Sequence, residues 1–385
     1  FGQSAGDVYY AAKAFICTDV ARWIKEEGIG IDVCTGGELA VALAGGIDPK
    51  KIEVHGNNKS VAEIERAVEV GVKTIVIDSL FEIDRVAAAA IKHGVRQGVM
   101  LRLTPGVEAH THESISTAHE DVKFGFSIAS GAAAVAVAEV LTHTSLELRG
   151  FHCHVGSQIF GTDSFELAAT RIIALMKACK EKHGIELPEL DLGGGYAIAY
   201  LSGETTVEPE DVLPSLSAVV KRECAAAGLA LPIISIEPGR NIVGPTTFTL
   251  YEVGTVKDVV IEGGKVRKYV SVDGGMSDNA RTALYDAEYT AVIAQRNSTA
   301  PLALTRLVGK HCETGDIIIN EIQLPSDIAP GDLVATPATG AYGRSMASNY
   351  NHVPRPPVVA VKDGKARVIV RRENEADLLS LDVKE

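Results

Sequence analysis

Short hydrophobic runs alternate with longer, Ala-rich stretches of helical periodicity over residues 1–243. This alternation is typical of βα units. It predicts strands at residues 8–12, 31–34, 52–55, 74–78, 98–103, 146–155, 187–192 and 233–237. It predicts helices at residues 20–27, 37–44, 61–70, 81–92, 165–182 and 212–227, and we expect caps at Asp19, Ser60 and Ser79. Eight strands favour an α/β fold with a closed (β/α)8 TIM barrel over an open sheet.

After residue 243 the pattern changes to strands with few long helices between them. Strands are predicted at residues 247–260, 266–273, 302–308, 317–320, 333–336, 358–361 and 366–370. The pairs Gly263-Gly264 and Asp363-Gly364 are typical of hairpin turns. The sequence therefore predicts a barrel domain at residues 1–243 and a mostly β domain at residues 244–385.

Composition narrows the class of protein. The 385 residues include 37 basic and 50 acidic side chains, a net charge of −13, which disfavours nucleic acid and anionic membranes as partners and favours a small-molecule substrate. The six cysteines contain no C-x-x-C pair, so we expect reduced thiols in a cytoplasm. No apolar run is long enough for a membrane span. Because the chain begins with Phe1 almost directly before a strand, we expect that an N-terminal segment precedes it.

Lys13 lies at the first predicted strand, in the stretch DVYYAAKAF. With a period of two, Tyr9, Ala11 and Lys13 share one face, so in a closed barrel the ammonium would point inward. A buried ammonium must be neutralised, paired or used covalently. Two interpretations stay open: a strand-end lysine that reaches solvent, or an amine of lowered pKa that forms a Schiff base with a carbonyl cofactor.

Other polar side chains also follow predicted strands. In a (β/α)8 barrel the chemistry lies at the carboxyl ends of the strands, so these groups should converge on one rim. They are Lys13, Asp32, His55, Asp78, Arg102, His154, residues 193–195 and Glu237.

Two turns on this rim suit an anion. Residues 191–196 (DLGGGY) contain three successive glycines, which let backbone N–H groups approach a phosphate closely. Residues 235–240 (SIEPGR) place a carboxylate before a backbone turn and a guanidinium. A tight turn alone would explain the first motif. Together the two turns could hold one phosphate, with Glu237 placed to pair with a ring nitrogen.

The H-x-H pair His152 and His154 has a different possible use. Two imidazoles on one strand face could bind a metal, as in amidohydrolase-like enzymes, and so could His110 and His112 if that segment were extended. The remaining ligands of such a site are missing from the other strand ends, so no metal is expected. A hydrogen-bonded core imidazole is the simpler interpretation of His152.

Six motifs occur in one order along the chain: residues 10–14 (YAAKA), 152–158 (HCHVGSQ), 191–195 (DLGGG), 237–240 (EPGR), 312–316 (CETGD) and 340–342 (GAY). In this order they resemble the diaminopimelate decarboxylase family, part of the alanine-racemase-like, fold-type III group of pyridoxal-phosphate enzymes. The resemblance extends to about residue 357. It implies a barrel followed by a β domain, pyridoxal 5'-phosphate as cofactor, and active sites shared between the subunits of a homodimer.

The same resemblance implies a role for each matched residue. Lys13 would form the Schiff base, His154 would stack on the cofactor ring, and Glu237 would pair with the ring nitrogen. The remaining cofactor contacts would come from Asp32, Ser157, Gly193, Gly194, Gly195, Pro238, Gly239, Arg240 and Tyr342. The substrate would be bound by Arg240, Arg281, Tyr285, Glu313 and Tyr342, and the proton donor, supplied by the second subunit, would be Cys312.

The implied substrate has an amino-acid group at each end. Arg281 is suited to bind a carboxylate through two parallel hydrogen bonds, and Glu313 could receive the distal ammonium. These groups match meso-2,6-diaminopimelate, which would lose CO2 to give L-lysine in the last step of lysine biosynthesis. Thr282 stands where the family usually has proline, which could loosen residues 279–285. The expected N-terminal segment, which contributes a strand to the family's β domain, is absent from the sequence.

Three alternatives remain in view. Ornithine, arginine and carboxynorspermidine decarboxylases share the scaffold, but a substrate without a second carboxylate would leave Arg240 or Arg281 uncompensated. Alanine racemase would require a tyrosine base and an arginine at the ring nitrogen, which Glu237 argues against. A non-catalytic pyridoxal-phosphate-binding protein would be a single barrel, whereas this chain has a second domain with Cys312 and Tyr342.

Overall fold

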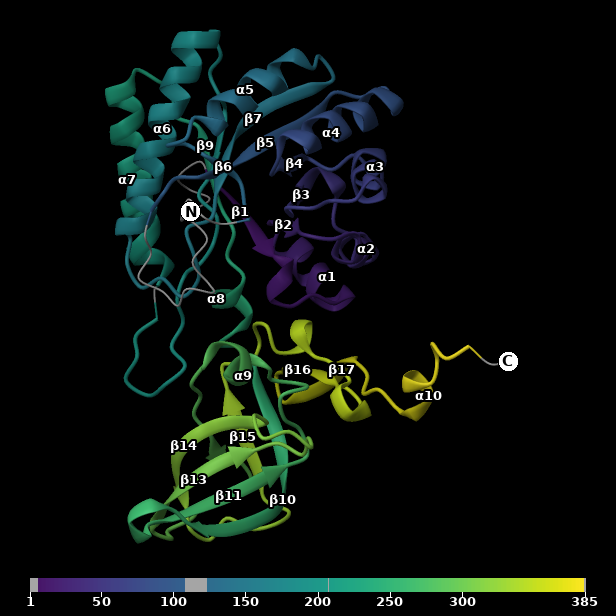
Figure 1. The fold of residues 1–385 in the computed structure, drawn as a ribbon, viewed down its shortest axis with the longest axis vertical. Helices are drawn as coiled ribbons and strands as arrows, with labels where there is room; N and C mark the ends of the chain where they lie inside the picture. The colour runs from purple at the N-terminus through teal and green to yellow at the C-terminus, as the bar shows by residue number, and fades with distance from the viewer. Residues whose placement is uncertain (1–5, 108–122, 207, 384–385) are drawn as a thin grey trace. The chain divides into compact units, whose positions relative to one another are not determined.

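The computed structural model describes residues 6–107, 123–206 and 208–383. The chain forms two compact units (Figure 1). The barrel unit contains Phe1–Ala197 and Thr206–Asn241, and the β unit contains Ile198–Thr205 and Ile242–Glu385. The β unit therefore includes a short excursion of the chain from within the barrel sequence.

The barrel unit is built on eight parallel strands that close into a ring. Their order is β1-β2-β3-β4-β5-β7-β8-β9, and β9 pairs with β1. The strands are β1 (Gly6–Ala11), β2 (Gly30–Val33), β3 (Ile52–Val54), β4 (Thr74–Ile77), β5 (Gln97–Thr104), β7 (Leu146–Cys153), β8 (Glu189–Asp191) and β9 (Ile233–Ile236). This confirms the predicted TIM barrel. A short strand that the sequence pattern does not predict, β6 (Phe126–Ser127), pairs with β5.

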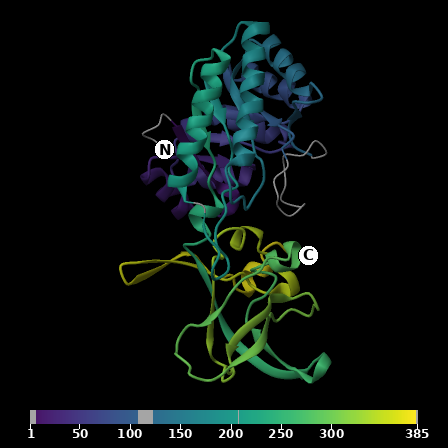
Figure 2. The same cartoon turned by 90° about the vertical axis from the view of Figure 1, so that its left-hand side faces the viewer.

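Seven longer helices belong to the described part of this unit. They are α1 (Thr18–Glu26), α2 (Gly36–Ala44), α3 (Val61–Val70), α4 (Leu80–Lys92), α5 (Ala132–Thr142), α6 (Asp163–His183) and α7 (Pro209–Ala227). Helices α6 and α7 lie side by side in both views (Figures 1 and 2). The pattern does not predict α5, because its run of alanine and valine has almost no polar face to create a helical period. Short helical turns occur at Ala12–Ala14, Pro49–Lys51 and, as α8, Arg240–Val243.

The three predicted caps have different outcomes. Ser60 caps α3 in a full capping box, since its side chain accepts from the Glu63 N–H and the Glu63 side chain accepts from the Ser60 N–H. Ser79 holds the N-cap position of α4 without a side-chain cap bond. The prediction for Asp19 is wrong: α1 begins one residue earlier, and Asp19 lies in its first turn in an ion pair with Arg22.

Charged groups are buried toward the amino-terminal ends of the barrel strands. The Lys73 ammonium lies 2.6 Å from the Tyr9 hydroxyl, 3.1 Å from Glu189 Oε2 and 3.9 Å from Glu53 Oε1. Arg149 also pairs with Glu189. A buried charge is costly unless it is paired, so this network lets the barrel keep ionisable groups inside.

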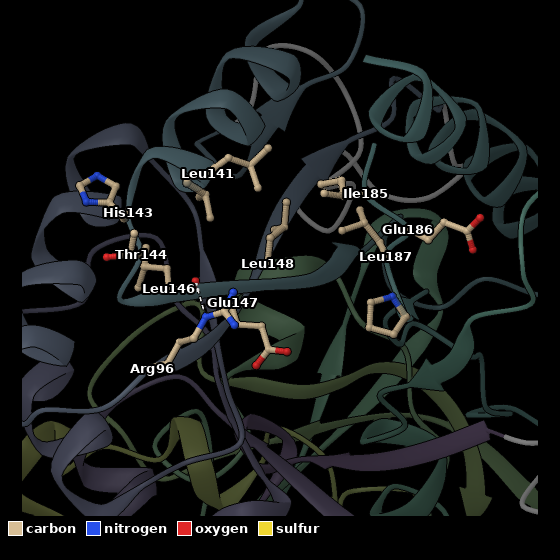
Figure 3. A pocket seen from close by; sticks show the side chains of 12 residues that line it. Arg96, Leu141, His143, Thr144, Leu146, Glu147, Leu148, Ile185, Glu186 and Leu187 are labelled. Atoms are coloured by element: carbon tan, nitrogen blue, oxygen red, sulfur yellow. Dashed lines mark hydrogen bonds between the residues drawn. The ribbon is translucent and has the colours of Figure 1, made fainter. Parts of the chain in front are cut away.

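A cavity of about 650 Å³ opens at the same end of the barrel (Figure 3). It is lined by the end of α5, the beginning of β7 and the connection from α6 to β8; Arg96, His143 and Glu186 are among its polar side chains. The predicted rim residues follow the opposite ends of the strands. This cavity is therefore separate from the candidate site.

The β unit contains a six-stranded sheet and a separate hairpin. The sheet order is β12-β15-β10-β11-β13-β14, and β16 pairs with β17. The strands are β10 (Phe248–Val260), β11 (Val266–Val272), β12 (Val292–Ile293), β13 (Leu302–Val308), β14 (Ile317–Pro325), β15 (Leu333–Pro337), β16 (Val358–Lys362) and β17 (Lys365–Val370). A mostly β domain is thus confirmed, although β12 was not expected and β14 runs five residues beyond the predicted 317–320.

Both predicted hairpin turns are present. The glycine pair 263–264 joins the antiparallel strands β10 and β11, within a 3-10 turn at Glu262–Gly264. Asp363 and Gly364 join β16 and β17 with positive φ values of 51° and 71°. Two successive positive φ angles match the right-handed twist of a hairpin, which explains an Asp-Gly pair there.

Short helical segments of the β unit are α9 (Arg281–Tyr285), α10 (Glu375–Leu378) and the 3-10 turns Arg344–Met346 and Tyr350–His352. The unit's core includes Ile198 and Tyr200 from the excursion, packed with strand residues such as Val270 and Leu307. Among the described residues, no helix is long and apolar enough to cross a membrane.

Candidate active site

Lys13 lies in a one-turn 3-10 helix rather than in a strand. Strand β1 ends at Ala11, and Ala12–Ala14 form the turn. The expectation that Lys13 continues the alternation of Tyr9 and Ala11 is therefore wrong, because the period of two stops at the strand end. The turn still places Lys13, which is partly buried, at the carboxyl end of β1.

The turns after β8 and β9 are packed so closely that they require glycine. A Cβ added at Gly194 would lie 2.1 Å from the Glu237 carbonyl oxygen, and one at Gly195 would lie 2.1 Å from that of Gly156. A Cβ at Gly193 would lie 2.3 Å from the Cys153 carbonyl oxygen. Since no side chain fits, the backbone itself forms this surface, as a close approach to a phosphate requires.

The β9 turn also contacts the end of β1. The Ala11 N–H donates to the Pro238 carbonyl at 3.0 Å, and a Cβ at Gly239 would lie 2.8 Å from the Ala11 Cβ. Glu237 N–H donates to the Gly193 carbonyl at 2.9 Å. These contacts bring the Lys13 turn and both glycine-containing turns together at one end of the barrel.

His154 and Ser157 approach the same turns from the end of β7. Nδ1 of His154 accepts a hydrogen bond from the Gly194 N–H at 3.3 Å, which orients the imidazole. Burial, with the nearby Lys13 ammonium, holds the pKa of His154 well below its ordinary value. The Arg240 guanidinium donates to Ser157 Oγ at 2.9 Å. The pair joins the β7 loop to the β9 turn.

Glu237 is buried between two imidazoles. Nε2 of His152 lies 3.2 Å from Oε2 of Glu237 in a hydrogen bond. Nε2 of His55 lies 2.8 Å from Oε1, off the line of a well-directed hydrogen bond. The two rings pack edge to face with centroids 4.7 Å apart. His152 is thus a hydrogen-bonded core imidazole, and His55, named from the sequence only as a rim residue, reaches Glu237.

Burial and charge set the protonation of these groups. Burial raises the pKa of Asp32, on β2, well above its ordinary value; the charge of Glu237 adds to this, and the Lys13 ammonium opposes it. Burial opposes ionisation of Glu237 as well, but His55 and then His152 hold its pKa well below its ordinary value. These directions favour the ionised form for Glu237 and the protonated form for Asp32.

The H-x-H pair does not form a shared ligand set. Among the described residues, no group of three potential ligand atoms within 4.8 Å of one another contains both His152 and His154. His152 groups instead with His55 and Glu237. His110 and His112 lie outside the described residues. The structure therefore does not bring the two imidazoles of the H-x-H pair to one ligand set, as the amidohydrolase-like alternative would require.

The β unit contains the predicted substrate-binding arginine. The Arg281 guanidinium lies 4.7 Å from the ring centroid of Tyr200 and 5.6 Å from that of Tyr289, and it donates to the Tyr289 hydroxyl at 2.6 Å. Cation–π contacts of this kind fix a guanidinium plane. Tyr285, also expected at the substrate, is partly buried at the end of α9.

Thr282 ties α9 down rather than loosening it. Its hydroxyl lies 2.8 Å from the carbonyl oxygen of Ile318 on β14 and 3.1 Å from that of Ala287, both within hydrogen-bonding distance. The side chain is buried. The threonine therefore provides a tertiary hydrogen bond where a proline would provide a rigid backbone.

Three loops of the β unit are joined by hydrogen bonds. The Cys312 N–H donates to Asn351 Oδ1 at 3.0 Å, and Nε2 of His311 lies 2.8 Å from Ser277 Oγ. The Ser348 N–H donates to the Ser277 carbonyl at 2.8 Å. Cys312 and Glu313 are exposed, and Tyr342 is partly buried with a positive φ of 60°. The loops that carry Arg281, Cys312 and Tyr342 are thus held in one framework.

Known proteins of similar sequence and fold identify the family. Residues 2–244 match the family described as "Pyridoxal-dependent decarboxylase, pyridoxal binding domain". A diaminopimelate decarboxylase of Mycobacterium bovis is 55% identical over the whole chain and 87% of its own length. The chain belongs to the diaminopimelate decarboxylase family.

Solved structures of diaminopimelate decarboxylases have the same fold as this chain. Diaminopimelate decarboxylase of Helicobacter pylori, complexed with L-lysine, is 29% identical, with a TM-score of 0.89 over 99% of this chain and 91% of that chain. The enzyme of M. jannaschii, also in complex with L-lysine, is 30% identical, with a TM-score of 0.89 over 98% and 85%. The chain is therefore a pyridoxal-phosphate-dependent carboxy-lyase by family.

The barrel end fits the cofactor of a diaminopimelate decarboxylase. A cofactor with a phosphate, an aldehyde and a basic ring nitrogen requires an anion cradle, an amine and a carboxylate. The glycine turns, Lys13 and the ionised Glu237 are groups of these three kinds. The contacts of His55 with Glu237, and of Tyr200 and Tyr289 with Arg281, were not predicted. His55 and Tyr200 come from distant parts of the chain, and Tyr289 lies beyond the short helix α9 that carries Arg281.

Proposed function

We propose that the chain catalyses the pyridoxal-phosphate-dependent decarboxylation of meso-2,6-diaminopimelate to L-lysine and CO2, the last step of lysine biosynthesis. The observation that supports this most is the meeting of Lys13, the glycine cradle and Glu237 at one barrel end in a chain with full-length diaminopimelate decarboxylase relatives. The two similar structures that contain L-lysine support the assignment of the product.

Residues of the barrel would hold the cofactor. Lys13 would bind it covalently through the ε-amine, His154 would lie against the ring, and Glu237 would pair with the ring nitrogen. The phosphate and its surroundings would be held by Asp32, Ser157, Gly193, Gly194, Gly195, Pro238, Gly239, Arg240 and Tyr342. Pyridoxal phosphate supplies an electron sink that accepts the electron pair left when CO2 departs.

The chain's own groups would then select the substrate and manage protons. Arg281, fixed between two tyrosines, would bind the carboxylate that is retained, and Glu313 would receive the distal ammonium. Arg240, Tyr285 and Tyr342 would complete the substrate contacts. Glu237, kept as an anion by its imidazoles, would stabilise positive charge at the ring nitrogen. The partner subunit's Cys312 would return a proton to the carbon that loses CO2.

A homodimer with shared sites follows from the roles proposed for Lys13 and Cys312. One residue belongs to the barrel unit and the other is an exposed residue of the β unit. A two-fold interface would let each subunit complete the other's site. We also propose that the protein works in the cytoplasm, where its six cysteines, all free, would stay reduced.

The substrate is tested by competing amino acids. Purified protein supplied with pyridoxal phosphate should form lysine and CO2 from meso-diaminopimelate and should act more slowly on ornithine. Arg281→Leu should lower kcat/KM for diaminopimelate by about ten to a hundredfold, because it removes a charge-assisted contact. Faster decarboxylation of ornithine than of diaminopimelate by the unmutated protein would contradict the proposal.

The covalent link is tested by borohydride reduction and peptide mapping, which should label Lys13. A label on another lysine would contradict that role. Subunit sharing is tested by mixing Lys13→Ala and Cys312→Ala proteins and allowing exchange. Random pairing gives half mixed dimers, so roughly a quarter of all sites should be intact. No recovery after confirmed exchange would exclude shared sites.

A further inference from the structure

The carboxylate proposed for the ring nitrogen belongs to a buried cluster of three. Glu53 on β3, Asp191 on β8 and Glu237 after β9 each have an oxygen within 4.8 Å of the others. Their exposed fractions lie between 0% and 6%. Three carboxylates this close and this buried do not all stay ionised, because their charges repel in a medium that screens poorly. Something must decide which of them keeps the charge.

Glu53 and Asp191 have little to stabilise a negative charge. Neither oxygen of Glu53 has a hydrogen-bond partner, and the Lys73 ammonium, 3.9 Å from one of them, lies closer to Glu189. One Asp191 oxygen accepts from the Gly193 N–H at 2.7 Å, whereas the other has no partner. Burial raises the pKa of Glu53 to about 8 and that of Asp191 well above its ordinary value.

Glu237 differs because each of its oxygens faces an imidazole. His55 approaches one oxygen and His152 the other. Nδ1 of His152 has no partner while Nε2 faces the carboxylate, which places the proton on Nε2. Burial lowers the pKa of His152 to about 4, so this residue donates as a neutral imidazole. A carboxylate can accept up to four hydrogen bonds, so these two contacts leave capacity for a third partner.

We propose that His55 and His152 are positioning residues that select Glu237 as the ionised member of the cluster. This inference rests on the proposed function, in which Glu237 pairs with the cofactor's ring nitrogen. The two imidazoles would act from one side of the carboxylate and the ring nitrogen from the other. Other charged or titratable groups close to this cluster come from β1 and its turn, β2, β5, the end of β7 and the turn after β8: Tyr9, Lys13, Asp32, Arg102, Cys153, His154 and Tyr196.

The first test requires no cofactor and no histidine variant. Infrared difference spectra of the cofactor-free protein against Glu237→Gln should contain an ionised carboxylate band at neutral pH, and those against Asp191→Asn should contain a protonated carboxyl band. The reverse assignment, with Glu237 protonated and Asp191 ionised, would overturn the proposal. A shift of the Glu237 carboxylate band on adding Zn²⁺ at stoichiometric amounts would also overturn it, by identifying the two histidines and Glu237 as a cation site.

The second test separates hydrogen bonding from packing. His152→Gln keeps a hydrogen-bond donor and His55→Gln keeps a polar N–H group that can face Oε1 of Glu237, whereas His152→Leu and His55→Leu remove both. The leucine variants should bind pyridoxal phosphate about tenfold to a hundredfold more weakly, and the acid limb of the visible absorption of the bound cofactor should move to higher pH. The glutamine variants should retain most of the affinity. His143→Gln is the matched control, because this partly buried histidine at the end of α5 lines the separate cavity at the opposite end of the barrel.

Together the infrared and binding results distinguish the positioning role of His55 and His152 from the proposed function. The positioning role would be overturned if the glutamine and leucine variants bound pyridoxal phosphate equally well. It would also be overturned if the acid limb of the visible absorption of the leucine variants stayed at the pH of the unmutated protein. If the leucine variants do not fold, the infrared assignment decides. A protein that fails to act on meso-diaminopimelate but has the expected infrared bands would refute the proposed function and leave the carboxylate assignment intact.

Discussion

The glycine cradle gives a sharp steric prediction at Gly194. The φ angle of this residue is not positive, so alanine would cause no backbone strain of its own. The added Cβ, however, would lie 2.1 Å from the Glu237 carbonyl oxygen and 3.1 Å from its carbonyl carbon. A Cβ needs at least 3.0 Å from such an atom, so the two turns must separate by about 0.9 Å, the difference between 3.0 and 2.1 Å.

This displacement falls on the residue that is proposed to hold the ring nitrogen. Overpacking of a tight contact costs about 1–3 kcal/mol. A shift of about 1 Å near the reacting centre can cost about a hundredfold in rate. Gly194→Ala should therefore weaken binding of pyridoxal phosphate about ten to a hundredfold and lower kcat for diaminopimelate by a similar factor.

The assay titrates cofactor-free protein with pyridoxal phosphate and follows visible absorption, with urea unfolding measured in parallel. Gly37→Ala is the matched control, because this helical residue has only Thr35 Oγ1 within 4 Å of an added Cβ, at 3.7 Å. Alanine there should leave binding unchanged and stabilise α2 by about 0.5–1 kcal/mol. A folded Gly194→Ala protein that binds the cofactor as the unmutated protein does would refute the steric argument.

Three further outcomes are expected. Burial raises the pKa of Glu53 from 4.5 to about 8, so between these pH values the folded state keeps a proton that the unfolded state releases. The free energy of unfolding, measured with urea, should therefore fall as the pH rises from about 4.5 to 8. Glu53→Gln should flatten this slope, whereas the control Glu69→Gln should not. Ser60→Ala removes an N-cap bond and should cost about 1 kcal/mol by thermal unfolding; no loss would contradict the capping box. Thr282→Val leaves the Ile318 carbonyl without its donor, so KM for diaminopimelate should rise while the affinity for pyridoxal phosphate stays the same.

The barrel could be predicted because its signals are local. Each strand is a short apolar run between turn residues, and each functional group follows such a run, so the rule that parallel strands end at one rim brings Lys13, His154 and Glu237 together without any tertiary information. Local signals also explain the two hairpins and the Ser60 cap. They fail at Lys13, where the alternation stops at Ala11, and in α5, whose alanines and valines have no polar face.

The partners of the site residues could not be predicted in this way. Arg281 is held by Tyr200 and Tyr289, and Tyr200 enters the β unit through an eight-residue excursion that no composition change marks. The approach of His55 to Glu237 crosses the barrel from β3 to β9. Such contacts depend on the closure and register of the ring, which the order of residues along one strand does not specify.

Glu53 lies between the charged groups at the two ends of the barrel interior, and its protonation sets the upper pH limit for cofactor binding. It lies 3.9 Å from Lys73 in the amino-terminal network and within 4.8 Å of Glu237 in the carboxylate cluster. A proton on Glu53 keeps a second negative charge away from Glu237. When that proton is lost, as the pH passes about 8, the new charge should raise the pKa of Glu237 and draw Lys73 away from Glu189. Glu53→Gln imitates the protonated state at every pH, so it should leave cofactor binding unchanged near neutrality and extend it into alkaline solution. In this variant stability should become insensitive to pH between about 4.5 and 8, and cofactor affinity should stay constant as the pH rises beyond about 8, because the same proton of Glu53 controls both.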